Sequence, residues 1–170
     1  MSFSHNQKGF TLIEMILYVA VCAIILLSLS TFLAFLLSSR VRNQAIGEVN
    51  QQGFQIMSLI TETVRNGRSI QVPTIGTSSS TLSMTTSNPV LNPTIFSLSS
   101  STLRIKEGSG NAIALSNSRI KVSGLLFQNV SSASSTEKVL RISYVIDYVN
   151  PQGRSEYSYT KTFTGSATIH

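Results

Sequence analysis

Glu14 is the ionisable residue whose surroundings demand most explanation. It is the only charged side chain in a run of 28 apolar or small residues, Phe10 to Leu37. About 20 such residues suffice to cross a bilayer as a helix, and a carboxylate in hydrocarbon costs several kcal/mol unless it finds a partner. Two interpretations are open. Glu14 is a helix-start residue near the interface that is favoured by the helix dipole, or it is held for a partner of opposite charge.

The other reactive side chains form no catalytic constellation. His5 precedes the apolar run, His170 is the last residue, and Cys22 lies within the run without a second cysteine. Ser–His and Cys–His catalysis need an internal histidine, which this sequence lacks. Beyond the run, Asp147 and five scattered Glu have no paired spacing and no metal-binding motif. We therefore expect no enzyme, no metal and no cofactor.

The apolar run predicts a membrane helix that stays with the mature protein. It is longer than the core of a cleaved secretory signal, about 7–15 residues, and no small-x-small cleavage site follows it. We place the short amino-terminal end in the cytoplasm, because the long polar part must lie on the other side. Positive charges flank the helix on both sides, with Lys8 before it and Arg40 and Arg42 after it, so the positive-inside rule is only weak evidence for its orientation.

The helix continues beyond the membrane segment with one apolar face. Its apolar residues recur at spacings of three and four: Ile46, Val49, Gly53, Met57, Ile60 and Val64. Asn66-Gly67 predicts the helix end. We expect one helix from about Phe10 to Asn66, with a bend or local melting at Gly47 or Gly53.

Residues after Pro73 predict strands joined by turns. Alternating patterns predict strands at Leu103–Lys106, Ala112–Leu115, Ile120–Ser123 and Val139–Val149, and a last strand with Tyr157, Tyr159 and Phe163 on one face. Thr77–Thr81 reads as a loop. We expect an α+β fold, in which the long helix packs on a small antiparallel sheet. The predicted parts are residues 1–9 as a leader, 10–38 as the membrane helix, 39–72 as its amphipathic continuation and 73–170 as a β-rich head.

The segment Lys8-Gly9-Phe10-Thr11-Leu12-Ile13-Glu14 resembles the cleavage site of type IV pilins and related pseudopilins. Six contiguous residues match, between a short polar leader and an uninterrupted apolar helix. The resemblance implies a pilin-like fold and cutting by prepilin peptidase between Gly9 and Phe10. It also implies methylation of the new amino group on Phe10. Lys8 keeps the leader at the cytoplasmic surface, and Gly9 lets the backbone approach the catalytic groups.

In that family, the glutamate at the position of Glu14 is thought to meet the amino terminus of a neighbouring subunit during assembly. An adjacent ammonium removes most of the penalty on a carboxylate in hydrocarbon. With Gly9 and Phe10 beside it, the assembly role is the stronger interpretation of Glu14.

Departures from the family pattern favour a minor subunit. There is no proline before Pro73, no cysteine pair and no acidic cluster that could hold calcium. The stretch Phe54 to Ile70, with Glu62 and Arg65, and the final Tyr-rich hairpin resemble J-type minor pseudopilins in layout.

The resemblance implies a structural subunit of a pilus-like filament in filament initiation or at its tip. Its partners would be prepilin peptidase, other pilin or pseudopilin subunits and an inner-membrane assembly platform. It would be anchored by a single pass in the bacterial inner membrane and then enter an extracellular or periplasmic filament. The system stays open between type II secretion, competence and a retractile pilus.

Two alternatives remain. One is a membrane-anchored enzyme. The other is an adhesin or DNA-binding module displayed on the filament. The part after residue 39 carries 12 Lys or Arg against 6 Asp or Glu, and a weak contact of Arg104, Lys106, Arg119 and Lys121 with DNA or another anionic surface would use this charge.

Overall fold

The computed structural model of the protein describes Gly9 and residues 11–169, without the side chain of Glu156. The chain divides into two compact units, Met1–Arg40 and Val41–His170. Lys8, Phe10 and both histidines lie outside the described residues.

One continuous helix, α1 (Leu12–Arg65), spans 54 residues and belongs to both units. It ends one residue before the predicted end, a difference within the usual fraying of a helix terminus. Neither Gly47 nor Gly53 interrupts it, so the expected bend or melting is absent from the described helix. In the first unit its apolar side chains are exposed, whereas in the second unit one face is buried.

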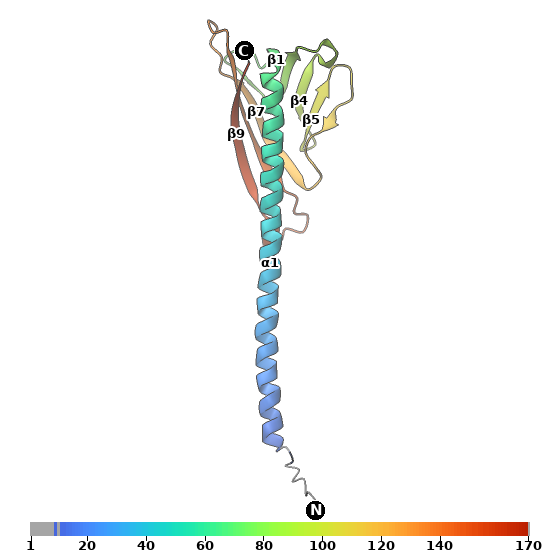
Figure 1. Cartoon of the computed structure of the whole chain (residues 1–170), viewed down its shortest axis with the longest axis vertical. Coiled ribbons are helices and arrows are strands. Elements are labelled where there is room, and N and C mark those ends of the chain that lie inside the picture. Colours follow the sequence, from blue (N-terminus) through green and yellow to red (C-terminus); the bar gives the residue numbers. More distant parts are fainter. Residues whose placement is uncertain (1–8, 10, 170) are drawn as a thin grey trace, which may run out of the picture. The chain divides into compact units, whose positions relative to one another are not determined.

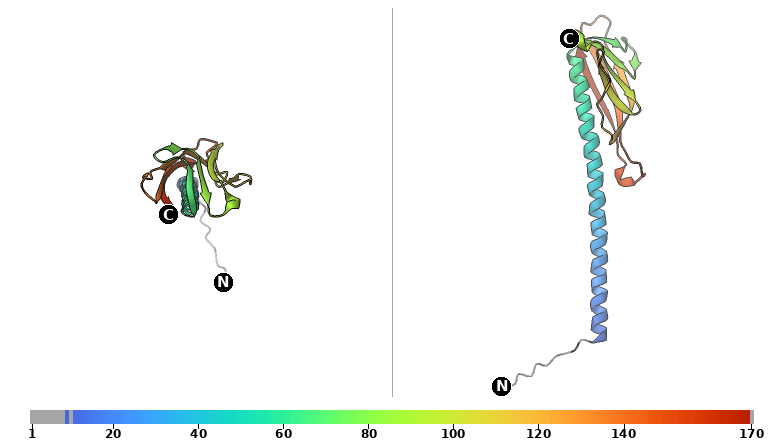
Figure 2. Two further views of the ribbon diagram at one scale, coloured as in Figure 1. Left: turned by 90° about the horizontal axis from the view of Figure 1, so that it is seen from above. Right: turned by 90° about the vertical axis from the view of Figure 1, so that its right-hand side faces the viewer.

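The second unit contains two antiparallel sheets beside α1 (Figures 1 and 2). The five-stranded sheet has the order β1-β3-β4-β5-β6 and the four-stranded sheet the order β2-β7-β8-β9. The strands are β1 (Gly67–Val72), β2 (Ser78–Ser79), β3 (Leu82–Thr86), β4 (Thr94–Ser99), β5 (Thr102–Glu107), β6 (Ile113–Ala114), β7 (Ile120–Asn129), β8 (Lys138–Tyr148) and β9 (Thr160–Ile169). Two short 3₁₀ helices, η1 (Pro89–Leu91) and η2 (Ser155–Tyr157), join strands.

This arrangement confirms the α+β fold class, a long helix packed against antiparallel sheet. The prediction of a single small sheet was wrong, because β1, β3 and β4 form most of a second one. The last strand begins at Thr160, so Tyr157 and Tyr159 both precede it, and of the three predicted residues only Phe163 lies on its buried face. Tyr157 belongs to η2, where its ring stacks on that of Tyr148 at 6.0 Å between centroids.

The core lies between α1 and both sheets. The helix contributes Ala45, Val49, Gly53, Ile56, Ile60 and Val64. Four of these belong to the predicted apolar face, while Ile46 and Met57 are only half-buried and Ala45 and Ile56 take their places. The sheets contribute buried side chains such as Leu82, Met84, Phe96, Phe127, Ile142 and Tyr144. Each amphipathic element thus buries its apolar face against another.

Helix and sheet approach each other closely at Gly53. A β-carbon on Gly53 would collide with the ring of Phe163 in β9. The main-chain carbonyl of Gly53 accepts a hydrogen bond of 2.7 Å from the buried hydroxyl of Tyr144 in β8. The rings of Tyr144 and Phe163 stack at 5.6 Å between centroids. Gly53 is therefore a contact point for β8 and β9.

Lys161 lies at the margin of this contact. Its ammonium donates to Asn50 Oδ1 at 2.7 Å and lies over the rings of Phe54 and Phe163, at 5.3 and 5.2 Å from their centroids. A cation over an aromatic face is attracted by the ring quadrupole. These contacts explain how a charged residue fits within the otherwise apolar inner face of β9.

Replacing Gly53 should destabilise the fold. In Gly53→Ala the new methyl group meets the Phe163 ring, and overpacking of this kind costs about 1–3 kcal/mol. The matched control is Gly47→Ala, since a β-carbon there meets no heavy atom within 4 Å. This control should be more stable than wild type by about 0.5–1 kcal/mol, because alanine has a higher helix propensity than glycine. Urea unfolding of the full chain in detergent, followed by circular dichroism, measures both, and equal stability of the two variants would contradict the close approach.

Tyr144 should make the fold sensitive to alkaline pH. Burial raises the pKa of its phenol well above the ordinary value near 10.0. Below about pH 10 the phenol stays protonated in both the folded and the unfolded chain, so the free energy of unfolding does not change with pH. Between about pH 10 and the raised pKa of the folded chain, only the unfolded chain releases the proton. The free energy of unfolding therefore falls by up to about 1.4 kcal/mol per pH unit.

The comparison with Tyr144→Phe isolates this effect. At neutral pH the free energy of unfolding of the variant should be lower by about 0.5–1.5 kcal/mol, because the hydrogen bond to Gly53 is lost. As the pH rises from 10 to 11, the difference between the two proteins should narrow by about 1 kcal/mol, because the variant cannot titrate there. If the difference in unfolding free energy between the two proteins stays constant, the buried phenol ionises as easily as an exposed one.

Candidate processing and assembly site

The start of α1 is capped by Thr11. The main-chain N–H of Glu14 donates to the Thr11 carbonyl at 3.1 Å and to Thr11 Oγ1 at 3.3 Å, and Met15 N–H donates to the same carbonyl at 3.2 Å. Thr-x-x-Glu is the pattern of a capping box, with the acidic residue in the first turn of the helix. We missed this cap in the sequence, although Thr11-x-x-Glu14 was the signal for it. Glu14 therefore has a helix-start role.

Gly9 lies in an exposed segment before the helix. A β-carbon built on it would meet no heavy atom within 4 Å. The fold of the described chain therefore does not require glycine at this position. Lys8 and Phe10, the other predicted processing residues, lie outside the described residues.

The carboxylate of Glu14 has a partner within its own helix. The hydroxyl of Tyr18 donates to Glu14 Oε1 at 3.2 Å, across one helical turn. Residues four apart lie on the same helix face, so the pairing follows from the spacing. Sequence reasoning missed Tyr18, and its signal was a hydroxyl-bearing aromatic residue four positions after the only carboxylate of the apolar run.

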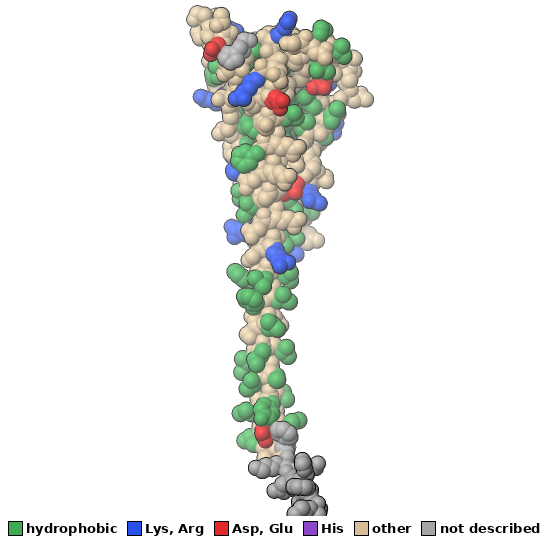
Figure 3. Space-filling view, in the orientation of Figure 1, with side chains coloured by type: hydrophobic (Ala, Val, Ile, Leu, Met, Phe, Trp, Pro, Cys, Tyr) green, Lys and Arg blue, Asp and Glu red, His purple; other side chains and the backbone are tan. Residues whose placement is uncertain are grey.

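The surroundings of this pair are apolar. Hydrophobic side chains cover the part of α1 that belongs to the first unit on the face that Figure 3 shows, and most are more than half exposed. No charged residue occurs from Met15 to Ser39. This part of the helix is long and apolar enough to cross a membrane. Lipid would offer Glu14 no hydrogen-bond donor, so donors must come from protein.

The described residues of the second unit do not gather into a reactive centre. No group of three or more His, Cys, Asp or Glu that could hold a metal ion occurs among the residues that the structure describes. Glu62 and Arg65 line a groove of about 640 Å³ along α1 together with Phe54 and Met57.

The four cations considered for DNA binding belong to different surroundings. Arg104 and Lys106 lie on β5 of the five-stranded sheet. Lys121 lies on β7 of the other sheet, where its cross-strand partner is the acidic Asp147. Arg119 is paired with a carboxylate of the helix.

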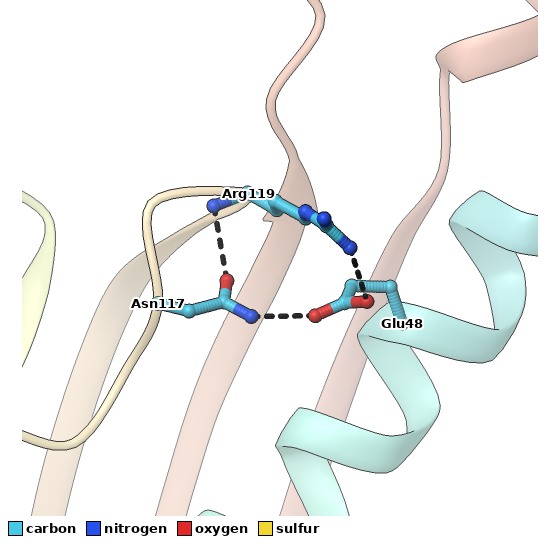
Figure 4. Close-up of polar contacts among 3 residues, drawn as sticks. All are labelled: Glu48, Asn117 and Arg119. Carbon is cyan, nitrogen blue, oxygen red and sulfur yellow. Dashed lines mark hydrogen bonds and ion pairs between the residues drawn. The ribbon is translucent and has the colours of Figure 1, made fainter.

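Figure 4 shows how Arg119 is held. Its guanidinium lies 3.6 Å from Glu48 Oε2, and Asn117 Nδ2 donates to Glu48 Oε1 at 2.5 Å. The main-chain N–H of Arg119 donates to Asn117 Oδ1 at 3.0 Å. The three residues tie the loop before β7 to α1. Arg119 therefore contributes to the attachment of this loop, while its side chain stays 61% exposed.

Comparison with known proteins identifies the amino-terminal segment. Residues 4–30 match the family model described as the prokaryotic N-terminal methylation motif. Searches of curated proteins and of solved structures gave no significant match. The matched residues include Gly9, Thr11, Glu14 and Tyr18.

The motif implies processing by prepilin peptidase and assembly with other pilin subunits, and it suggests a structural, non-enzymatic protein. Together with the apolar helix it fits anchoring in the inner membrane. The chain carries the prokaryotic N-terminal methylation motif, and both this motif and its α+β layout are consistent with a type IV pilin-like protein.

Proposed function

We propose that the protein is a minor structural subunit of a type IV pilus-like filament. Prepilin peptidase cuts it between Gly9 and Phe10, the new amino terminus on Phe10 is methylated, and α1 carries it into the filament. The observation that carries this proposal is the methylation motif at residues 4–30, which overlaps the start of a long apolar helix.

The geometry around Gly9 supports the proposed cut. A peptidase must bring the scissile backbone close to its catalytic groups, and a side chain there would stand between them. Gly9 is exposed and lies outside the helix, so its peptide bonds are not protected by helical hydrogen bonds. A β-carbon on Gly9 would meet no heavy atom of the described chain, so the packing of the chain does not account for this glycine, and recognition by the peptidase would.

The first part of α1 supports assembly through helix packing. Its apolar side chains point outward on every side and are exposed in the described chain. In the membrane they contact lipid. In a filament they would contact the corresponding helices of neighbouring subunits, where close packing favours association.

Glu14 supports a defined register of that packing. Cleavage after Gly9 would create an ammonium group four residues before Glu14 in the sequence. A carboxylate and an ammonium from adjacent helices cancel much of each other's cost in an apolar environment. A register that pairs them is therefore preferred over one that leaves both alone.

A minor rather than major subunit is favoured by what the sequence lacks. There is no cysteine pair, no proline before Pro73 and no acidic cluster suited to calcium. We propose a place in filament initiation or at the tip. A DNA-binding role is the weaker proposal, because two of the four cations considered for it have acidic neighbours: Arg119 pairs with Glu48 and Lys121 lies opposite Asp147.

Replacing Gly9 should block processing. In Gly9→Leu the side chain keeps the backbone from the peptidase, and misplacement of about 1 Å can cost about 100-fold in rate. We expect the uncut chain to accumulate in membranes, as measured by mass spectrometry. Gly47→Leu is the control, since a β-carbon there meets no heavy atom within 4 Å, and it should be cut normally. A Gly9→Leu protein that begins at Phe10 would refute the cleavage site.

Replacing Glu14 should separate processing from assembly. Glu14→Ala leaves the residues at the cut unchanged, so cleavage should stay within about twofold of wild type, while incorporation into filaments should fall about tenfold or more with loss of the ion pair. Incorporation is the ratio of protein in sheared filaments to protein in membranes. Leu12→Ala, a truncation without a charge change, should retain most incorporation. Equal incorporation of Glu14→Ala and wild type would refute the assembly role.

A further inference from the structure

We propose that Tyr18 is a positioning residue for Glu14. Its hydroxyl group holds the carboxylate in the orientation from which it receives the amino terminus of a neighbouring subunit. This inference rests on the proposed function, in which Glu14 meets that amino terminus.

The pair is built into the first two turns of α1. Thr11 fixes the backbone of Glu14 by accepting its N–H, and the Tyr18 hydroxyl fixes the side chain by donating to Oε1 at 3.2 Å. Both ends of the glutamate are therefore held by residues of the same helix. Glu14 is partly buried, whereas neighbouring Leu12 and Ile13 are 78% and 75% exposed.

The environment makes this hydrogen bond consequential. In water an exposed tyrosine hydroxyl would compete with solvent for the carboxylate and add little. In a membrane or filament core no solvent competes, and a hydrogen bond to a charged group is correspondingly stronger. No other charged side chain occurs before Arg40 in the apolar part of the helix.

The hydrogen bond leaves room for the second partner. A carboxylate has two oxygens with about four acceptor sites, and Tyr18 uses one site on Oε1. Oε2 and the remaining sites can accept from the neighbour's methylated ammonium, which keeps two N–H donors. Tyr18 and the neighbour's amino terminus therefore act on the same carboxylate together. The hydroxyl lowers the cost of ordering Glu14 when the neighbour arrives.

A different role for Tyr18 would be that of an interfacial anchor. Tyrosine is common where a membrane helix meets the headgroup region, because its ring is apolar and its hydroxyl is wet. An anchor depends on the presence of the ring and hydroxyl near the interface and does not depend on Glu14. The test must therefore move the hydroxyl relative to the carboxylate.

The experiment compares filament incorporation of four full-length proteins. Tyr18→Phe removes the hydroxyl and should lower incorporation about 3- to 10-fold, as expected for losing one preorganised contact. Leu17→Tyr in the Tyr18→Phe protein restores a hydroxyl three residues after Glu14, on the same helix face, and should recover most of it. Val19→Tyr in the Tyr18→Phe protein places it five residues away, on another face, and should not. Mass spectrometry should find all four cut to the same extent.

A spectroscopic measurement keeps the proposal testable if a variant does not accumulate. With ¹³C-labelled glutamate, the infrared difference between wild type and Glu14→Gln in lipid nanodiscs isolates the carboxylate band of Glu14. That band should shift in Tyr18→Phe and return in the Leu17→Tyr double variant, because it reports the hydrogen bond directly.

The outcomes separate this inference from the proposed function. Unchanged incorporation in Tyr18→Phe, rescue by the Val19→Tyr double variant, or an unshifted carboxylate band would each overturn the role of Tyr18 while Glu14→Ala still fails to assemble. Normal incorporation of Glu14→Ala in the same assay would instead overturn the assembly role of Glu14 itself.

Discussion

One helix must satisfy two different surroundings, and the rest of the structure follows from this constraint. A helix is the only single segment that satisfies all its backbone groups without water. From Leu12 to Leu37 apolar side chains lie on all sides of α1 and Glu14 is the only charged residue, whereas beyond Arg40 polar residues cover the face that points to solvent. The change in composition coincides with the boundary between the compact units at Arg40.

The second half of α1 contacts the protein's own hydrophobic core. Small residues determine how closely the sheets approach the helix there. Gly53 costs helix propensity but lets the Phe163 ring lie against the backbone and leaves its carbonyl accessible to Tyr144. A second glycine, Gly165 in β9, faces the Met57 sulfur in the same way. The two glycines, one on each element, set the depth at which β9 lies on α1. Their cost to the unfolded chain's entropy is offset by the aromatic packing they permit.

The sequence predicted what periodicity can reveal. The helix, β5, β7 and β8 have regular apolar spacing, and the predicted segments fall within or close to their bounds. The strands β1, β3 and β4 were missed; β3, for example, is only five residues long, and Leu82-x-Met84 offers only two apolar residues to detect. The shift of the buried helix face from Ile46 and Met57 to Ala45 and Ile56 could not be predicted, since Ala45, Ile46, Ile56 and Met57 are all apolar and the sequence does not show which of them face the sheets.

The same contrast holds at the amino-terminal site. The contiguous motif pointed to Gly9, Phe10 and Glu14, because consecutive residues can be recognised in a sequence without knowledge of the fold. It did not indicate Tyr18, whose relation to Glu14 exists only once a helix brings residues four apart to one face. The cap by Thr11 and the hydrogen bond from Tyr18 satisfy Glu14 from within its own subunit. A carboxylate that lies in lipid before its partner binds is best stabilised by donors that leave some of its acceptor sites free. One hydroxyl group on one oxygen meets that requirement.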